Sequence, residues 1–242
     1  MSKYDIYMNE VRELHEKGLT NALISKKLGI DSRRISDLLK KMSLKANDRK
    51  FNETPTKLQH EVFVSCVLGD GAIFKSDMNK NYRMNLAHSS KQKDYFLKKY
   101  NIVKDFIGVD YKEVSQYDKR TKKTYYAYKF QSLVNPYFTR LRNEWYREGK
   151  KIVPTTLYDE MTERVLAYKY FDDGNKTESG YSIAMCDFDD ESVQRFRDVL
   201  KQKYDIRTTL HNKNNVYIPS YERERFKDII YPYATEDLYY KI

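Results

Sequence analysis

Two aspartates in this chain have the setting of a paired carboxylate centre. Asp70 and Asp173 each follow an apolar segment with helical spacing, and each directly precedes a glycine. A carboxylate at the C-terminal end of a helix faces the negative end of the helix dipole, which costs stability. A hard divalent cation between two such carboxylates would remove that conflict. The pair therefore indicates hydrolysis at a phosphodiester, where Mg²⁺ binds phosphate oxygens, generates hydroxide and stabilises the leaving oxygen.

A single Asp-Gly pair is a common turn signal and has no chemical meaning by itself. Here the pair recurs at matching points of two similar segments of a basic protein. We expect each following glycine to adopt a left-handed conformation that turns the chain sharply into the next strand. The recurrence favours two functional acids over two unrelated turns.

The elements that must position these acids occur in a repeated order. Residues 57–154 contain a helix that ends at Asp70, and the corresponding helix of residues 155–242, expected over 156–171, ends at Asp172 and Asp173. In the first segment, strand-like runs are expected over 72–75, 82–88, 110–117 and 124–131, and helices over about 91–106 and 134–146. In the second, strand-like runs are expected over 181–186, 205–211 and 216–219, and helices over about 190–203 and 221–230. This repetition predicts an α+β fold of two αββαββα halves related by a pseudo-two-fold axis.

The composition narrows the classes of partner. The net charge is +10 and the pI is about 9.2, which favours a polyanion such as DNA. No apolar run approaches the roughly 18 residues of a membrane span, and the polar N-terminus lacks a signal pattern, so we expect a cytoplasmic or organellar protein with no membrane partner. The only cysteines, Cys66 and Cys186, lie in apolar segments, which argues against disulfides and a cysteine zinc site. Most of the 23 tyrosines are expected on half-buried strands.

The N-terminal residues 1–45 form an expected helical module, and the polar residues 46–56 form an expected linker. Residues 20–29 and 30–40 resemble a helix-turn-helix in which Gly29 ends the first helix and Asp31 or Ser32 caps the second. Residues near the start of the second helix would meet base edges in such a motif, and the candidates are Ser32, Arg33, Arg34 and Ser36. A small helical bundle for protein contacts is the alternative for this module.

Two segments carry a resemblance to a known family. Residues 63–71, FVSCVLGDG, and residues 166–174, LAYKYFDDG, resemble the two motifs of single-chain LAGLIDADG homing endonucleases. The ordered set VLGDGAIF, HSSKQKDYF, GKKIVP, LAYKYFDDG and LYYKI extends the resemblance over about residues 56–242. The second motif departs from the family at Tyr168, Lys169 and Asp172, which implies asymmetric packing of the two motif helices.

The resemblance implies a fold, a partner and a metal. The two motif helices would pack against each other, with Ser65 and Gly69 allowing a close approach. Two curved antiparallel sheets would form a saddle on double-stranded DNA, in a monomer with internal symmetry. Mg²⁺, or Mn²⁺ or Ca²⁺ in its place, would be held by Asp70 and Asp173 with the adjacent Gly69 and Asp172.

Basic and polar residues around such a centre position water, and His88, Lys129 and Lys241 are the candidates. Strand placement adds Lys75, Arg83, Lys129 and Lys176 as candidate DNA contacts. The plain alternatives are a histidine that hydrogen-bonds at a strand end and lysines that are simply solvated.

These observations predict a Mg²⁺-dependent, site-specific double-strand DNA endonuclease with an added helix-turn-helix that tightens binding by tethering. The alternative is a nucleic-acid-binding protein without cleavage on the same scaffold, either an RNA maturase or a transcription regulator. Retention of both acids favours the endonuclease, because a pure binding protein has no need of them. A protein-interaction module explains neither the duplication nor the acids.

Overall fold

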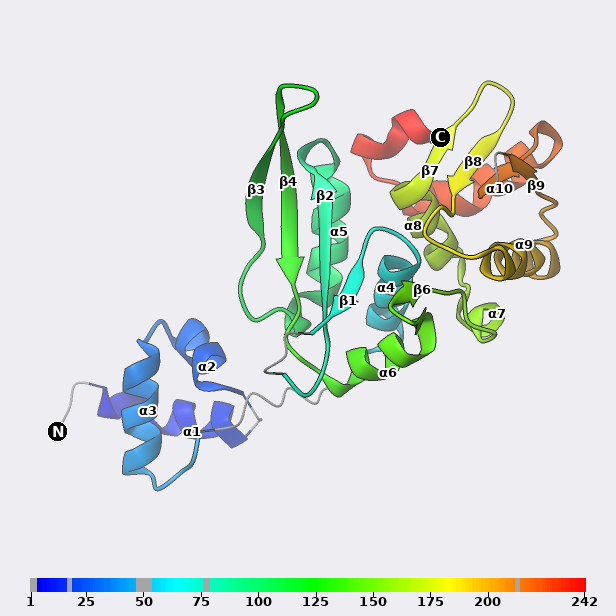
Figure 1. The fold of residues 1–242 in the computed structure, drawn as a ribbon. Helices are drawn as coiled ribbons and strands as arrows, with labels where there is room; N and C mark the ends of the chain where they lie inside the picture. Colours follow the sequence, from blue (N-terminus) through cyan, green and yellow to red (C-terminus); the bar gives the residue numbers. More distant parts are fainter. Residues whose placement is uncertain (1–3, 17–18, 47–53, 76–78, 212–213) are drawn as a thin grey trace.

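The computed structural model describes residues 4–16, 19–46, 54–75, 79–211 and 214–242. A three-helix module at the N-terminus stands beside two halves, each built on a four-stranded antiparallel sheet (Figure 1). Within the described ranges, no helix is both long and apolar enough to cross a membrane.

The first half is an αββαββα unit whose sheet has the strand order β1-β2-β4-β3. A two-stranded ribbon, β5 (Tyr146–Arg147) and β6 (Lys150–Lys151), follows it and leads into the second half. The main elements are α4 (Lys57–Leu68), β1 (Ala72–Phe74), β2 (Arg83–Ser89), α5 (Lys93–Val103), β3 (Lys112–Asp118), β4 (Lys123–Gln131) and α6 (Pro136–Trp145), with the 3₁₀ turns η2 (Ser90–Gln92) and η3 (Lys104–Phe106).

The second half repeats this topology in the strand order β7-β8-β10-β9, which confirms the predicted duplication. Three of its four strands are shorter than their counterparts, and the long hairpin of β3 and β4 has no counterpart of equal length (Figure 1). The elements are α7 (Leu157–Glu160), α8 (Glu163–Asp173), β7 (Gly174–Lys176), β8 (Tyr181–Ala184), α9 (Asp190–Tyr204), β9 (Thr209–His211), β10 (Asn215–Ile218) and α10 (Arg223–Ile230), with the 3₁₀ turns η4 (Ser220–Glu222), η5 (Tyr231–Tyr233) and η6 (Glu236–Lys241).

Three details of the second half differ from the prediction. The single helix expected over 156–171 is broken at Met161, whose ψ of 84° is not helical, and Thr162 caps a new helix by accepting from the Val165 N–H. Strand β7 was not predicted, because GNK is not a strand-like run. The strand expected over 205–211 begins only at Thr209, because Asp205 ends α9 in a left-handed conformation.

The two motif helices, α4 and α8, pack against each other at the centre of the molecule. Residues 62–68 of α4 and 165–171 of α8 are all buried, so each helix is covered on every side. One continuous hydrophobic core therefore runs through both halves.

Strand β2 shows which way each face of the first sheet points. Its alternate residues Met84, Leu86 and His88 are buried, whereas Ala87 is exposed and pairs with the exposed Lys129 of β4. The buried series faces the helices, and the exposed series forms the outer face of the sheet.

The N-terminal module consists of η1 (Asp5–Tyr7), α1 (Met8–Glu16), α2 (Asn21–Leu28) and α3 (Ser32–Lys41). It has a hydrophobic core of its own, which includes Ile24, Ile35 and Leu38. Gly18 and residues 47–53 of the expected linker lie outside the described residues, so the exact boundaries of the linker stay a prediction.

Separate cores predict separate responses to mutation. We expect Ile35→Ala, which truncates a fully buried side chain of the module, to cost the module about 2–5 kcal/mol. Amide hydrogen exchange should accelerate in residues 4–44 and stay unchanged in α4 and α8. Ile183→Ala, at a fully buried position of the second half, should give the reverse pattern. Equal acceleration in both parts with Ile35→Ala would contradict the two-core description.

Candidate active site

The glycines that flank the two acids serve close packing. We expected left-handed glycines after Asp70 and Asp173, and this is wrong: among the described glycines only Gly29 and Gly149 have positive φ. A Cβ on Gly71 would lie 2.7 Å from the Cys66 carbonyl oxygen, and one on Gly174 would lie 2.2 Å from the Tyr170 ring. Close approach to the preceding helix therefore excludes side chains at both positions.

Gly69 shows the same constraint between the two halves. A Cβ at this position would lie 2.2 Å from Oδ2 of Asp172, which comes from the other motif helix. The motif helices thus end in contact, and their ends bring the acids Asp70, Asp172 and Asp173 together.

Asp70 follows the end of α4 and keeps 38% of its side chain exposed. Its Oδ2 lies 3.2 Å from Nδ1 of the buried His88. Its main-chain N–H donates to Oδ2 of Asp172 at 3.2 Å. The Asp70 side chain therefore lies beside a residue of its own half, whereas its main chain is held by a residue of the other half.

Asp172 is fully buried and enclosed by donors. Nζ of Lys99 lies 2.7 Å from its Oδ1 and 3.0 Å from its Oδ2, and the Tyr95 hydroxyl donates to Oδ1 at 2.7 Å. Burial disfavours both charges, but their attraction holds the pKa of Asp172 below its ordinary value and that of Lys99 above. Asp172 is thus an ionised carboxylate that locks the end of α8 onto α5 of the first half.

Asp173, the second predicted acid, is 28% exposed and pairs with Lys169 one turn earlier in α8, at 2.6 Å. Nζ of Lys169 also donates to the Ala184 carbonyl at 3.0 Å. Burial raises the pKa of Asp173, the Lys169 ammonium opposes this, and the negative charges of Asp172 and Asp70 raise it further. Asp173 is therefore held within its own helix by Lys169, and the charge of Asp70 is the smallest of the effects on its pKa.

Two more lysines, from segments outside the motif helices, contact main-chain carbonyls at the ends of these helices. Lys151 of β6 donates to the Gly69 carbonyl at 2.6 Å, and Lys241 of η6 donates to the Phe171 carbonyl at 2.6 Å and the Asp172 carbonyl at 3.5 Å. Burial lowers the pKa of both lysines, with Lys169 adding to the effect at Lys151. Each motif helix thus ends against an ammonium supplied by the segment that closes its own half.

The candidate residues around the acids and on the strands lie in different places. His88 and Lys241 lie at the acids, as described above. Lys129 lies on the outer face of the first sheet together with Arg83, whose Nη1 donates to Gln131 at 3.1 Å. Lys75 is exposed just after β1, and Lys176 donates to the main-chain oxygen of Ile242 at 2.6 Å.

Four residues of the site escaped the sequence analysis: Tyr95, Lys99, Lys151 and Lys169. Lys169 stood out as a departure from the motif, and its spacing of four from Asp173 already indicates an ion pair on one helix face. Lys151 lies within GKKIVP, one of the segments that carry the resemblance. Tyr95 lies within HSSKQKDYF, another of these segments, whereas no sequence signal indicates that Lys99, on a helix of the other half, meets Asp172.

The donor set suits a hard divalent cation. One ligand atom each from Asp70, His88 and Asp172 lie within 4.8 Å of one another, and this cluster contains Asp172 in place of the predicted ligand Asp173. Two of its three members are carboxylates, which Mg²⁺ and Ca²⁺ prefer as ligands.

Comparisons with known proteins agree with this geometry. The model of the LAGLIDADG DNA endonuclease family matches residues 60–228. The chain is 27% identical over 208 residues to DNA endonuclease I-ChuI of Chlamydomonas applanata, which covers 77% of this chain and 95% of that protein. It is 24% identical over 199 residues to the cytochrome b mRNA maturase bI2 of Debaryomyces hansenii, which covers 79% and 76%. The solved structure of homing endonuclease I-WcaI bound to its DNA recognition sequence is similar in fold, with a TM-score of 0.72, 23% identity, and coverage of 84% of this chain and 91% of that one.

Because the two motif helices end in contact, a single methyl group added at Gly69 should lower the stability of the protein. Gly69→Ala should destabilise the protein by roughly 1–3 kcal/mol in urea unfolding, because the added carbon meets an oxygen that Lys99 holds in place. Gly108→Ala is the control: its Cβ would meet only the flexible end of Leu133 at 2.5 Å, so the cost should be smaller. Equal costs would contradict the close contact at Gly69.

Removal of the Lys99 charge should have a pH-dependent cost. Lys99→Met leaves Asp172 buried without its main partner, and we expect a loss of about 3–5 kcal/mol at neutral pH. In the wild type the pKa of Asp172 is lower in the folded than in the unfolded state. The ion pair therefore stabilises the fold fully above the unfolded-state pKa, and this stabilisation is lost as the pH falls through the folded-state pKa. In the variant burial dominates and raises the pKa of Asp172, so the variant is destabilised most above the unfolded-state pKa.

The difference in unfolding free energy between wild type and Lys99→Met should therefore shrink as the pH is lowered from 7 to about 4. Lys98→Met is the matched control on the same helix, because Lys98 donates to the Tyr233 carbonyl at 2.8 Å and to no carboxylate in the described residues. Its cost should stay near 1 kcal/mol at every pH. A Lys99→Met cost that is constant with pH would show that Asp172 is not the ionised partner.

Proposed function

Because this chain belongs to the LAGLIDADG DNA endonuclease family, we propose that it cleaves both strands of a specific DNA duplex with Mg²⁺ held at Asp70 and Asp173. The observation that carries this proposal is that α4 and α8, one from each half, pack against each other, with Asp70 just after the end of α4 and Asp173 as the last residue of α8. A pseudo-two-fold axis between them suits a substrate with two antiparallel strands. Each half then addresses one scissile phosphate.

The accessibility of each acid supports this assignment of roles. Asp70 and Asp173 expose 38% and 28% of their side chains, whereas Asp172 exposes none. Both side-chain oxygens of Asp172 already accept hydrogen bonds from Lys99, Tyr95 and the Asp70 N–H. The main-chain carbonyls of Gly69 and Asp172, which also accept from Lys151 and Lys241, are the atoms through which these two residues would contribute.

When bound, Mg²⁺ supplies an activated water and stabilises charge on the phosphate. The side chains of the protein orient the metal ligands and neutralise their negative charge. Asp70 and Asp173 would hold the ions, and the buried His88 places Nδ1 3.2 Å from the Asp70 carboxylate. Lys151 and Lys241 carry ammonium groups whose pKa burial has lowered, so either can donate a proton to the leaving oxygen as the P–O bond breaks.

The outer face of the first sheet supplies the DNA contact in this proposal. Arg83 and Lys129 lie on that face, and the turn between β3 and β4 adds Lys119, Arg120, Lys122 and Lys123. Basic side chains along a sheet neutralise phosphates, and the released counterions make binding depend steeply on salt. Lys75 is exposed just after β1 and is a further candidate contact.

RNA maturase activity is the second candidate function, because one relative is named as an mRNA maturase. Such an activity requires RNA binding and no hydrolysis at Asp70 and Asp173. The two candidates therefore differ in whether the acids are needed.

Substitution of each acid tests the endonuclease proposal. Asp70→Asn and Asp173→Asn should each reduce double-strand cleavage of a DNA library by more than about a hundredfold in Mg²⁺, because a direct ligand matters more than the residues that orient ligands. Binding of the same DNA without metal should change by only a few-fold. The measurements are sequencing of cut ends and a gel-shift titration.

Asp228→Asn, at an exposed position on α10, is the matched control and should cut like the wild type. If either active-site variant cuts both strands at the wild-type rate, its assigned role is wrong. If the wild type binds RNA and DNA yet cuts no DNA in Mg²⁺, the maturase candidate takes precedence.

A further inference from the structure

The N-terminal module has the geometry of a helix-turn-helix. Helix α2 begins at the cap Thr20 and ends at Gly29, which adopts a left-handed conformation with φ of 65°. Ile30 is buried in the turn, and Asp31 caps α3 by accepting from the Arg33 N–H at 2.8 Å. A turn of three residues thus sets α3 across α2.

One side of α3 is packed and the other is open. Ile35, Leu38 and Leu39 enter the core of the module. Ser36 is half-buried and accepts a hydrogen bond from Asn21 at 3.0 Å, so its oxygen helps join α3 to α2. The exposed residues of α3 are Ser32, Arg33, Arg34, Asp37, Lys40 and Lys41.

This open side has the chemistry of a DNA-reading surface. Arg33 and Arg34 lie in the first turn of α3, where a recognition helix meets base edges. Residues 1–50 contain 12 lysines and arginines against 7 acids, a net charge of +5. A positive, polar helix face next to a DNA endonuclease fits a nucleic-acid duplex better than an apolar protein surface.

The position of the module relative to the sheets is the second, independent observation. Strand β3 is the outer edge of the first sheet, farthest from the second half. From left to right in Figure 1 the order is the module, β3, β4, β2, β1, and then the second half, and the module lies lower than the strands. The module therefore lies outside the edge strand β3, toward the end at which the chain enters that strand.

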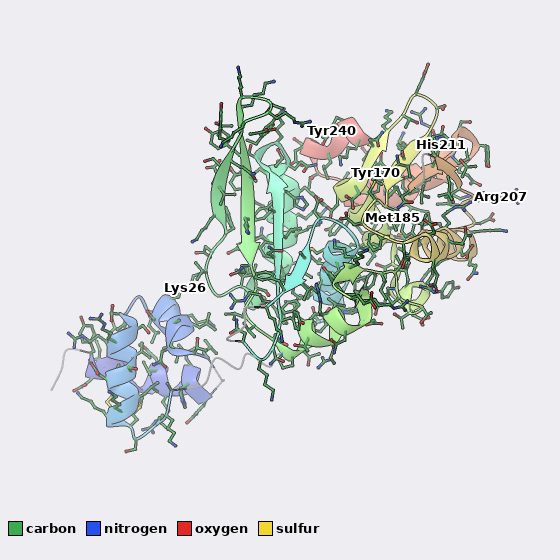
Figure 2. The ribbon with its side chains drawn as sticks, viewed as in Figure 1. Lys26, Tyr170, Met185, Arg207, His211 and Tyr240 are labelled. Atoms are coloured by element: carbon green, nitrogen blue, oxygen red, sulfur yellow. The ribbon has the colours of Figure 1, made fainter. Side chains whose placement is uncertain are left out.

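A direct contact joins the module to that edge. Nζ of Lys26 in α2 lies 2.7 Å from Oδ1 of Asp110, two residues before β3, and the Tyr100 hydroxyl donates to the same oxygen at 2.8 Å. Lys26 lies at the boundary between the module and the first half, whereas Arg207 lies at the opposite end of the molecule (Figure 2). A duplex that crosses both sheets and leaves over β3 would next meet the module.

We propose that the module places α3 in a major groove of the DNA that leaves the first half over β3, so that the target extends about one helical turn farther on that flank only. The inference rests on the proposed DNA-binding function. One turn of duplex is about 34–36 Å, and the twelve residues between Leu44 and Lys57 can span up to about 40 Å. The tether therefore permits this spacing, and the chain holds no matching module for the other flank in the described residues.

The test is selection of bound duplexes from a random DNA library by the full chain in EDTA. Wild-type protein should select a central sequence and a further block about ten base pairs beyond one of its ends. Arg33→Ala and Arg34→Ala should each reduce enrichment of that block by roughly 5- to 100-fold and leave the central sequence unchanged. Arg12→Ala removes the same charge from an exposed position of α1 and should keep the block.

The flank is identified by thiol-directed cleavage. Cys66 is buried, so a Cys186→Ser background presents no native exposed thiol in the described residues. Iron chelate attached after Val114→Cys on β3 should cut DNA on the side of the extra block. The same chelate after Thr209→Cys on β9, the outer strand of the second sheet, should cut on the opposite side.

Three results would overturn the inference. These are a wild-type selection without the extra block, a block that both arginine variants retain, and a block on the side cut from position 209. A module that contacts protein gives the first result. Cleavage is tested independently of the module. A selected duplex that carries the one-sided block but stays uncut in Mg²⁺ would refute cleavage and leave the placement of the module intact.

Discussion

Neutralisation of buried negative charge at the ends of the two motif helices is the constraint on which this structure depends. Asp172 and Asp173 end α8 beside the end of α4, and burial makes both negative charges costly unless a cation accompanies them. The cations come from different parts of the chain: Lys99 from α5, Lys151 from β6, Lys169 from α8 itself and Lys241 from η6. Neutralising the centre therefore ties the outer segments of both halves to its middle. We had expected a metal alone to relieve the conflict of an acid at a helix end, and in the structure the lysines supply much of that relief.

The C-terminal turn η6 shows how far this dependence extends. Asp237 accepts the N–H groups of Asp94 and Tyr95 at 2.8 and 3.3 Å, and thus caps α5 of the other half. That helix carries the Tyr95 and Lys99 side chains that hold Asp172, and Asp172 in turn accepts from the Asp70 N–H. A chain of hydrogen bonds thus leads from the end of the second half to the acid of the first. The two halves are similar in topology but depend on each other for the geometry of the site.

The symmetry of the site is broken by sterics at its centre. The position of Asp172 in the second motif corresponds to Gly69 in the first, and the space beside Gly69 is filled by the Asp172 carboxylate. Only one of the two positions can carry a side chain. The second half supplies the Asp172 carboxylate, and the first half leaves room for it with Gly69. Tyr168, the other departure in the second motif, is fully buried with its ring edge-on to Tyr95 at 5.4 Å. The same asymmetry appears outside the core, where β3 and β4 are longer than β9 and β10 and where the N-terminal module contacts the first half through Lys26 and Asp110.

The amino-acid sequence by itself determined the repeated order of elements, the two acids and the separate helical module. Periodicity and turn residues act over a few positions along the chain, so α4, α5, α9 and the α2–α3 pair were all predictable from local patterns. The tertiary structure alone decided which acid is accessible and which is locked, because burial and ion pairing depend on residues far apart in sequence. Asp172 and Asp173 are neighbours of identical type, yet one meets Lys99, 73 residues away, and the other meets Lys169, four residues away. The role of the glycines was likewise a matter of contact: their φ values needed no left-handed turn, and what excludes a side chain at Gly69 is an atom of the other half.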